Sequence, residues 1–113
     1  MNAPKNEIRL ARLLALVRGY SLKFPDGFDD WLVGNLHVYL AFEAEALSVA
    51  ERREHYSART IIEFLRHHTL LAEAGEGWKL DNDMAPGLAR LFAAAHPRHG
   101  ALFEFRERQK AAA

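Results

Sequence analysis

The chain has 113 residues, half of them apolar and none of them cysteine, and its formal net charge at pH 7 is zero. This length fits one domain with a single modest core, and the apolar fraction excludes intrinsic disorder. The lack of cysteine excludes disulfides and thiolate zinc sites, and charge neutrality argues against strong non-specific binding to nucleic acid.

Membrane insertion is not expected. The longest uncharged run, 31–42, has 12 residues, whereas a membrane span needs roughly 20. Glu7, Arg9 and Arg12 interrupt the apolar residues near the N-terminus, which is not typical of a signal peptide. We therefore expect a cytoplasmic protein, and the absence of cysteine agrees with that compartment.

The charges are unevenly distributed along the chain. Residues 1–23 carry a net charge of +4, 24–51 carry −6, 52–83 carry −1 and 84–113 carry +3. We expect the basic ends to pair with the acidic middle on folding, although the same asymmetry allows a local basic face.

Residues 1–27 are predicted to form an N-terminal amphipathic helix and turn, packed on a single domain of residues 28–113. One helical stripe contains Leu10, Leu13, Leu14 and Val17. Pro25-Asp26-Gly27 predicts a turn in which the glycine takes a positive φ. Such a helix could lie on a membrane or a partner helix, but no linker follows it, which favours packing on the domain.

Residues 36–51 have a wide apolar arc on a helical wheel, which predicts the central core helix. Glu43 falls inside this arc. Because an unpaired buried charge is very costly, we expect Glu43 to pair with an arginine from another helix. The alternative is that Glu43 acts as a catalytic acid.

The next helix is predicted from its N-cap Ser57 to about Ala72. Its inward residues are Ile61, Ile62, Phe64, Leu65, Leu71 and Ala72. His68 also lies in the apolar arc, where we expect it to bond to a backbone carbonyl. Arg59 and Arg66 belong to an outer row, which is either a solvated face or an edge that contacts phosphates.

Apolar and polar residues alternate over 78–80 and over 103–106, which predicts two strands that pair with each other. A helix over 84–96 lies between them, with Pro86 in its first turn and Pro97 after its end. The predicted fold class is therefore α+β, mainly α, with a short two-stranded sheet.

The outer face of the 84–96 helix carries small residues and one guanidinium: Pro86, Gly87, Arg90, Ala93 and Ala94. A solvent-facing surface normally carries several charges. We therefore expect another helix, a second subunit or a phosphate backbone to approach this face closely.

Catalytic and metal-binding patterns are weak. His96 and His99 are separated by Pro97, which breaks the helix that would align them, and no cysteine completes a set. Ser48 and Ser57 lack the G-x-S-x-G context, and the chain has no Gly-rich phosphate loop. We predict no enzymatic activity, no metal and no cofactor.

Four runs, with N-L-H-V-Y-L-A-F-E-A-E-A upstream of them, belong to a match that covers about residues 28–106: Y-S-A-R-T-I-I-E-F-L-R, W-K-L-D-N-D, L-A-R-L-F and F-E-F-R. They resemble a family of small, mostly uncharacterised proteins encoded by phages, prophages and mobile elements. The resemblance implies a winged-helix-like domain and a phage-associated accessory role.

Two functions are considered. The first is DNA binding, mostly to phosphates, through Arg59, Arg66, Lys79, Asn82, Arg90 and Arg106. Because a recognition helix needs several base-reading side chains, such binding would be weak and salt-sensitive. The alternative is a protein-interaction module, such as an inhibitor of a host factor or a homodimer, in which the acids of 24–51 could imitate nucleic acid. Its contact surface would be Gly87, Arg90, Ala93 and Ala94.

Overall fold

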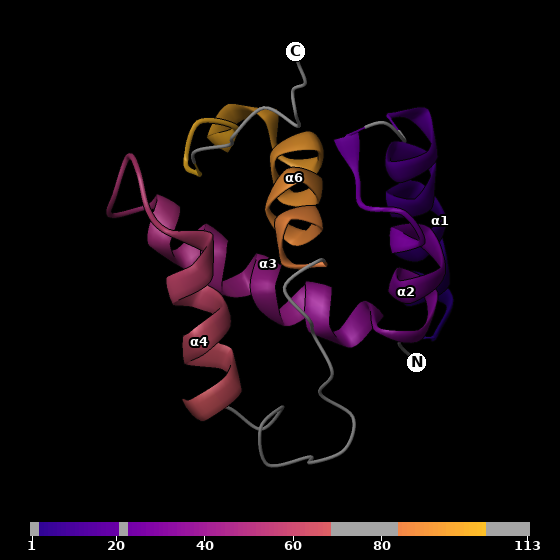
Figure 1. Ribbon diagram of the computed structural model, residues 1–113, viewed down its shortest axis with the longest axis horizontal. Coiled ribbons are helices and arrows are strands. Elements are labelled where there is room, and N and C mark those ends of the chain that lie inside the picture. Colours follow the sequence, from indigo (N-terminus) through magenta and orange to yellow (C-terminus); the bar gives the residue numbers. More distant parts are fainter. Residues whose placement is uncertain (1–2, 21–22, 69–83, 104–113) are drawn as a thin grey trace.

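The computed structural model describes residues 3–20, 23–68 and 84–103. These residues form helices α1 (Ala3–Gly19), α2 (Phe28–Gly34), α3 (Leu36–Ala50), α4 (Ala58–His68) and α6 (Ala85–Ala95), and the 3₁₀ turn η3 (Pro97–His99). In Figure 1, α6 lies in the middle, with α1 on one side of it and α4 on the other, and α3 passes beneath.

The predicted α+β class, with a two-stranded sheet and a winged-helix-like arrangement, is wrong. Every regular element in the described ranges is helical, and none is a strand. Residues 78–80 and 104–106 lie outside those ranges. Phe103 is described, and it lies in a bend, where its ring packs against Phe42 and Phe92 at centroid distances of 5.6 and 5.7 Å. Its apolar ring is therefore buried in a core that is formed by helices.

The predicted stripe of the first helix packs as expected. Leu13 and Val17 of α1 are buried, and Leu10 and Leu14 pack partly buried against the same core. α1 contacts both α2 and α6. The turn before α2 is also confirmed: Gly27 has φ 79°, a left-handed value that glycine adopts without steric cost.

α3 is a core helix, as predicted. It contacts α2, α4 and α6, and its buried side chains are Val38, Tyr39, Phe42, Glu43, Ala46 and Val49. A helix that is apolar over most of its surface must be covered by neighbours, and α3 has them on several sides.

α4 and α6 each place one apolar face on this core. The Thr60 amide donates to Ser57 Oγ at 3.2 Å, which confirms Ser57 as the N-cap of α4. Ile61, Ile62 and Leu65 are buried, but Phe64, which we predicted to be inward, is 42% exposed. The core of α6 is Gly87, Leu88, Ala89, Leu91 and Phe92.

Candidate functional site

The small-residue face of α6 meets other helices of the same chain. Gly87 is buried, and a Cβ added to it would collide with the ring of Phe28 in α2. α1 also contacts α6. The close approach that the sequence predicts is therefore made at Gly87 by another helix of this chain, and Gly87 is not accessible to a partner.

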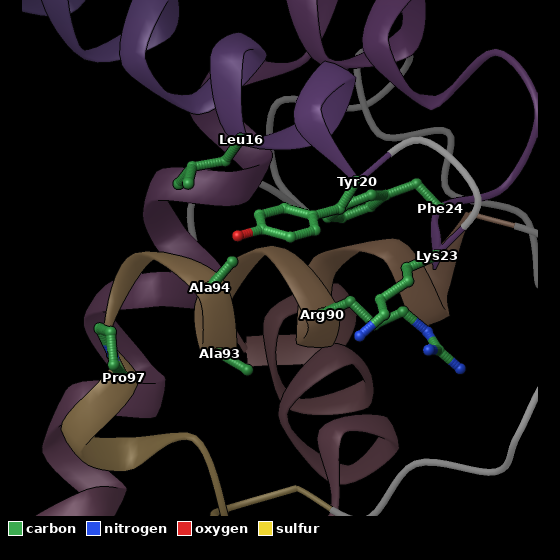
Figure 2. Close-up of a pocket in the computed structure, with 8 residues that line it drawn as sticks. All are labelled: Leu16, Tyr20, Lys23, Phe24, Arg90, Ala93, Ala94 and Pro97. Carbon is green, nitrogen blue, oxygen red and sulfur yellow. The ribbon is translucent and has the colours of Figure 1, made fainter.

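Further along α6 the same face borders an open cavity of about 450 Å³ (Figure 2). Its lining residues are Leu16, Tyr20, Lys23, Phe24, Arg90, Ala93, Ala94 and Pro97. Pockets that bind small ligands have volumes of about 300–1,000 Å³. Three of the four residues predicted to bind a partner therefore line one hollow of ligand-binding size.

The local chain path explains how the hollow forms. The Tyr20 amide donates to the Leu16 carbonyl at 3.2 Å, and the Lys23 amide donates to the Tyr20 carbonyl at 2.8 Å, so the chain turns directly after α1. Phe24 is then buried and stacks on Phe28 at 5.5 Å. This anchor holds the turn beside α6, where alanines leave the space unfilled.

The cavity is apolar over most of its lining and positively charged at one end. Figure 2 shows Lys23 and Arg90 on the same side of the hollow, while the Tyr20 ring reaches across it towards Ala94. Among the described residues that line the cavity, none is acidic. Such a surface suits an apolar group that lies next to an anion, because each half of the ligand meets a complementary half of the cavity.

The residues predicted to bind DNA do not come together on one surface in the described ranges. Arg59 is exposed on α4, and Arg66 Nη1 lies 3.3 Å from Glu63 Oε2. Arg90 lines the cavity beside α1, and Figure 1 shows α1 and α4 on opposite sides of α6. Lys79, Asn82 and Arg106 lie outside the described residues. DNA binding stays a prediction.

A second polar feature is a buried cluster around Glu43. Its Oε2 accepts hydrogen bonds from Arg9 Nη2 at 2.7 Å, His96 Nε2 at 2.8 Å and the Tyr39 hydroxyl at 3.3 Å. Arg9 is on α1 and His96 directly follows α6. The expected pairing of Glu43 with an arginine from another helix is confirmed, and one carboxylate joins three helices.

The electrostatics of this cluster favour a structural role. Burial alone would raise the pKa of Glu43, but the hydrogen bonds from Arg9 and His96 and the Arg9 charge outweigh it and lower that pKa. Burial, followed by the charge of Glu43, raises the pKa of Tyr39, so its hydroxyl stays a donor. Glu43 is thus held ionised and offers no proton near neutral pH.

The histidines do not form a metal site among the residues that the structure describes. His96 is bonded to Glu43, and His67 Nε2 lies 3.3 Å from Glu63 Oε1 on the surface of α4. No group of three histidines and carboxylates that could hold a metal occurs in that part of the chain. The side chain of His68 lies outside it.

Sequence reasoning did not single out Tyr20 and Lys23 as binding residues. The one signal for them was a lysine flanked by aromatic residues, Tyr20 and Phe24, just before a turn. It also missed Arg9, Tyr39 and His96 as the partners of Glu43. Arg9 and His96 lie 34 and 53 positions away from Glu43 in the chain, and Tyr39 lies one turn before it on the same helix.

Comparisons with protein-family models, with curated proteins and with solved structures found no significant match. Within the described residues, no helix is long and apolar enough to cross a membrane. Functional inference therefore rests on the geometry of the sites themselves.

Proposed function

We propose that the protein is a non-enzymatic protein-interaction module that binds a segment of a partner in the cavity between the end of α1 and α6. The observation that carries this proposal is the pair of cations, Lys23 and Arg90, at one end of a hollow floored by alanines. An accessory role of the kind implied by the phage-protein resemblance agrees with such a module.

The chemistry of the cavity defines the partner segment. Its apolar lining favours a large apolar side chain, since removing such a surface from water is favourable by about 25 cal/mol per Å². The two cations favour a carboxylate beside that side chain. Tyr20, which is 56% exposed at the rim, is a residue type that often dominates binding energy at interfaces. The expected ligand is an acidic segment with one bulky apolar residue.

Fluorescence anisotropy with capped, labelled peptides tests this proposal. The first peptide places leucine between two glutamates, and matched peptides carry glutamine or lysine in place of the glutamates. We expect saturable binding that weakens from glutamate to glutamine to lysine. Lys23→Glu should weaken binding of the acidic peptide, while Lys5→Glu, an exposed lysine outside the cavity, should not.

A second pair of variants tests the position of the ligand. Ala94→Glu puts a carboxylate into the hollow and should block the acidic peptide, while Ala44→Glu, on the exposed surface of α3, should leave binding unchanged. Equal binding of all three peptides, or equal effects of both alanine variants, would contradict the proposal. Light scattering over a range of protein concentrations shows whether the occupant is a second copy of this chain, because the measured mass then rises with concentration.

DNA binding through Arg59 and Arg66 is tested separately with a labelled duplex at two salt concentrations. If α4 contacts phosphates, affinity falls steeply with salt, because neutralising phosphates releases counterions. Arg59→Gln with Arg66→Gln should then reduce both the affinity and its salt dependence. Absence of binding at low salt would rule out this function.

A further inference from the structure

A second cavity lies between the segment that follows α3 and the segment that follows α6. It has a volume of about 350 Å³ and is lined by Ala50, Arg53, Glu54, His55, Arg98, His99, Ala101 and Leu102. None of these residues lines the cavity described above. A ligand bound here would therefore contact other residues than the proposed partner segment does.

The two walls of this second cavity are fixed to each other. The Tyr56 amide donates to the Leu102 carbonyl at 2.8 Å, and His55 Nδ1 lies 3.1 Å from the Ala101 carbonyl. Leu102 and the adjacent Phe103 are buried in the core. Segments that lie 46 residues apart in the chain are thus held together at the cavity.

Several basic side chains are also held in place there. The Arg53 guanidinium lies over the Tyr56 ring, 5.5 Å from its centroid, and the His99 ring stacks on Phe92 at 6.4 Å. Because a carbonyl can only accept, His55 Nδ1 carries the hydrogen and donates to Ala101. Groups that are already oriented lose little entropy when a ligand binds.

The charges of the cavity point to an anion. Among the described residues that line it, two carry guanidinium groups, Arg53 and Arg98, and one carries a carboxylate, Glu54. Guanidinium groups match the oxygens of phosphate in geometry as well as charge. We propose that this cavity binds a phosphate group, held by Arg53 and Arg98 with His99 as a further donor.

Titration of inorganic phosphate into the ¹⁵N-labelled full chain at pH 7, with ionic strength matched by chloride, tests the proposal. We expect saturable shifts confined to residues 53–56 and 98–102. Arg53→Gln with Arg98→Gln should reduce the affinity at least about tenfold, as expected when charge-assisted hydrogen bonds are lost. Arg52→Gln is the matched control, because Arg52 is the exposed neighbour that does not line the cavity.

Two further ligands distinguish the sources of the phosphate. A nucleoside monophosphate should compete with inorganic phosphate at these residues, while the nucleoside alone should not. If a DNA duplex competes at the same residues, the phosphate comes from nucleic acid, and the site stands. The proposal is overturned if inorganic phosphate causes no saturable shifts, or if the double variant binds it as tightly as the Arg52→Gln control.

Discussion

Replacing Glu43 with glutamine removes the charge that Arg9 and His96 share, while it keeps the size of the side chain and one oxygen acceptor. In the native protein a single oxygen, Oε2, receives all three donors of the cluster. The amide of glutamine can accept these bonds only as a neutral group. The expected result is a loss of stability with the fold retained.

The exposure of Glu43 and Arg9 sets the magnitude of the expected loss of stability. Breaking a fully buried ion pair costs about 3–5 kcal/mol, while an exposed pair contributes about 0–1 kcal/mol. The side chain of Glu43 is 7% exposed but that of Arg9 is 43% exposed, so the arginine can be rehydrated when its partner is lost. An intermediate loss of about 2 kcal/mol is expected, which lowers Tm by about 10 °C in a domain of this size.

The stabilisation that Glu43 provides depends on pH, and the sign of this dependence is definite. Since the folded-state pKa of Glu43 is lowered, its carboxylate stabilises the fold fully above the pKa of the unfolded chain, about 4.3. That contribution is lost as the pH falls through the lower pKa of the folded state. The difference between native protein and Glu43→Gln should be largest at neutral pH and shrink below about pH 4.

Thermal and urea unfolding, followed by circular dichroism at pH 7 and at low pH, measure both effects. Glu45→Gln is the matched control, because Glu45 is on the same helix outside the cluster. It should change stability by less than about 0.5 kcal/mol. A Glu43→Gln variant as stable as Glu45→Gln at pH 7 would refute the reasoning.

Gly87→Ala should cost about 1–3 kcal/mol in urea unfolding, because its Cβ would collide with the buried Phe28 ring; an unchanged midpoint would contradict that packing. Ser57→Ala removes the cap of α4 and should cost about 1 kcal/mol. Ser48→Ala, on the exposed side of α3, should cost less than about 0.5 kcal/mol, and equal losses for the two serines would argue against the cap. Gly27→Ala should lower Tm by destabilising the fold about 1 kcal/mol, because φ there is 79°; a Tm equal to that of the native protein would show that the turn relaxes.

Local patterns predicted the helices well where they depend on one face or one cap. The stripe through Leu13 and Val17, the cap at Ser57 and the turn at Gly27 all follow from chemistry within a few residues. The burial of Glu43 with an arginine partner was also predictable, because a carboxylate in an apolar arc requires a cation.

The sheet was predicted wrongly because alternation over three or four residues carries little information. Phe103 alternates with its neighbours in the way a strand would, but it lies in a bend and fills a space between Phe42 and Phe92. Phe64 shows the opposite error. The wheel places it among the inward residues of α4, yet its side chain is 42% exposed in the structure.

The sites themselves depend on tertiary contacts that no local pattern contains. The alanines of α6 were recognised as unusual, but only the folded chain shows that Tyr20 and Lys23 complete the hollow beside them. The second cavity combines Arg53 with Arg98 across a backbone hydrogen bond between Tyr56 and Leu102. Residue type alone gave no reason to associate these segments.

The position of the Glu43 cluster has a consequence for ligand binding. Its donors come from α1 and from the residue that follows α6, and these two helices also provide opposite walls of the larger cavity. One buried carboxylate therefore helps to set the width of an opening that it does not line. A partner that binds between Tyr20 and Ala94 should bind less tightly to Glu43→Gln, although it never touches residue 43.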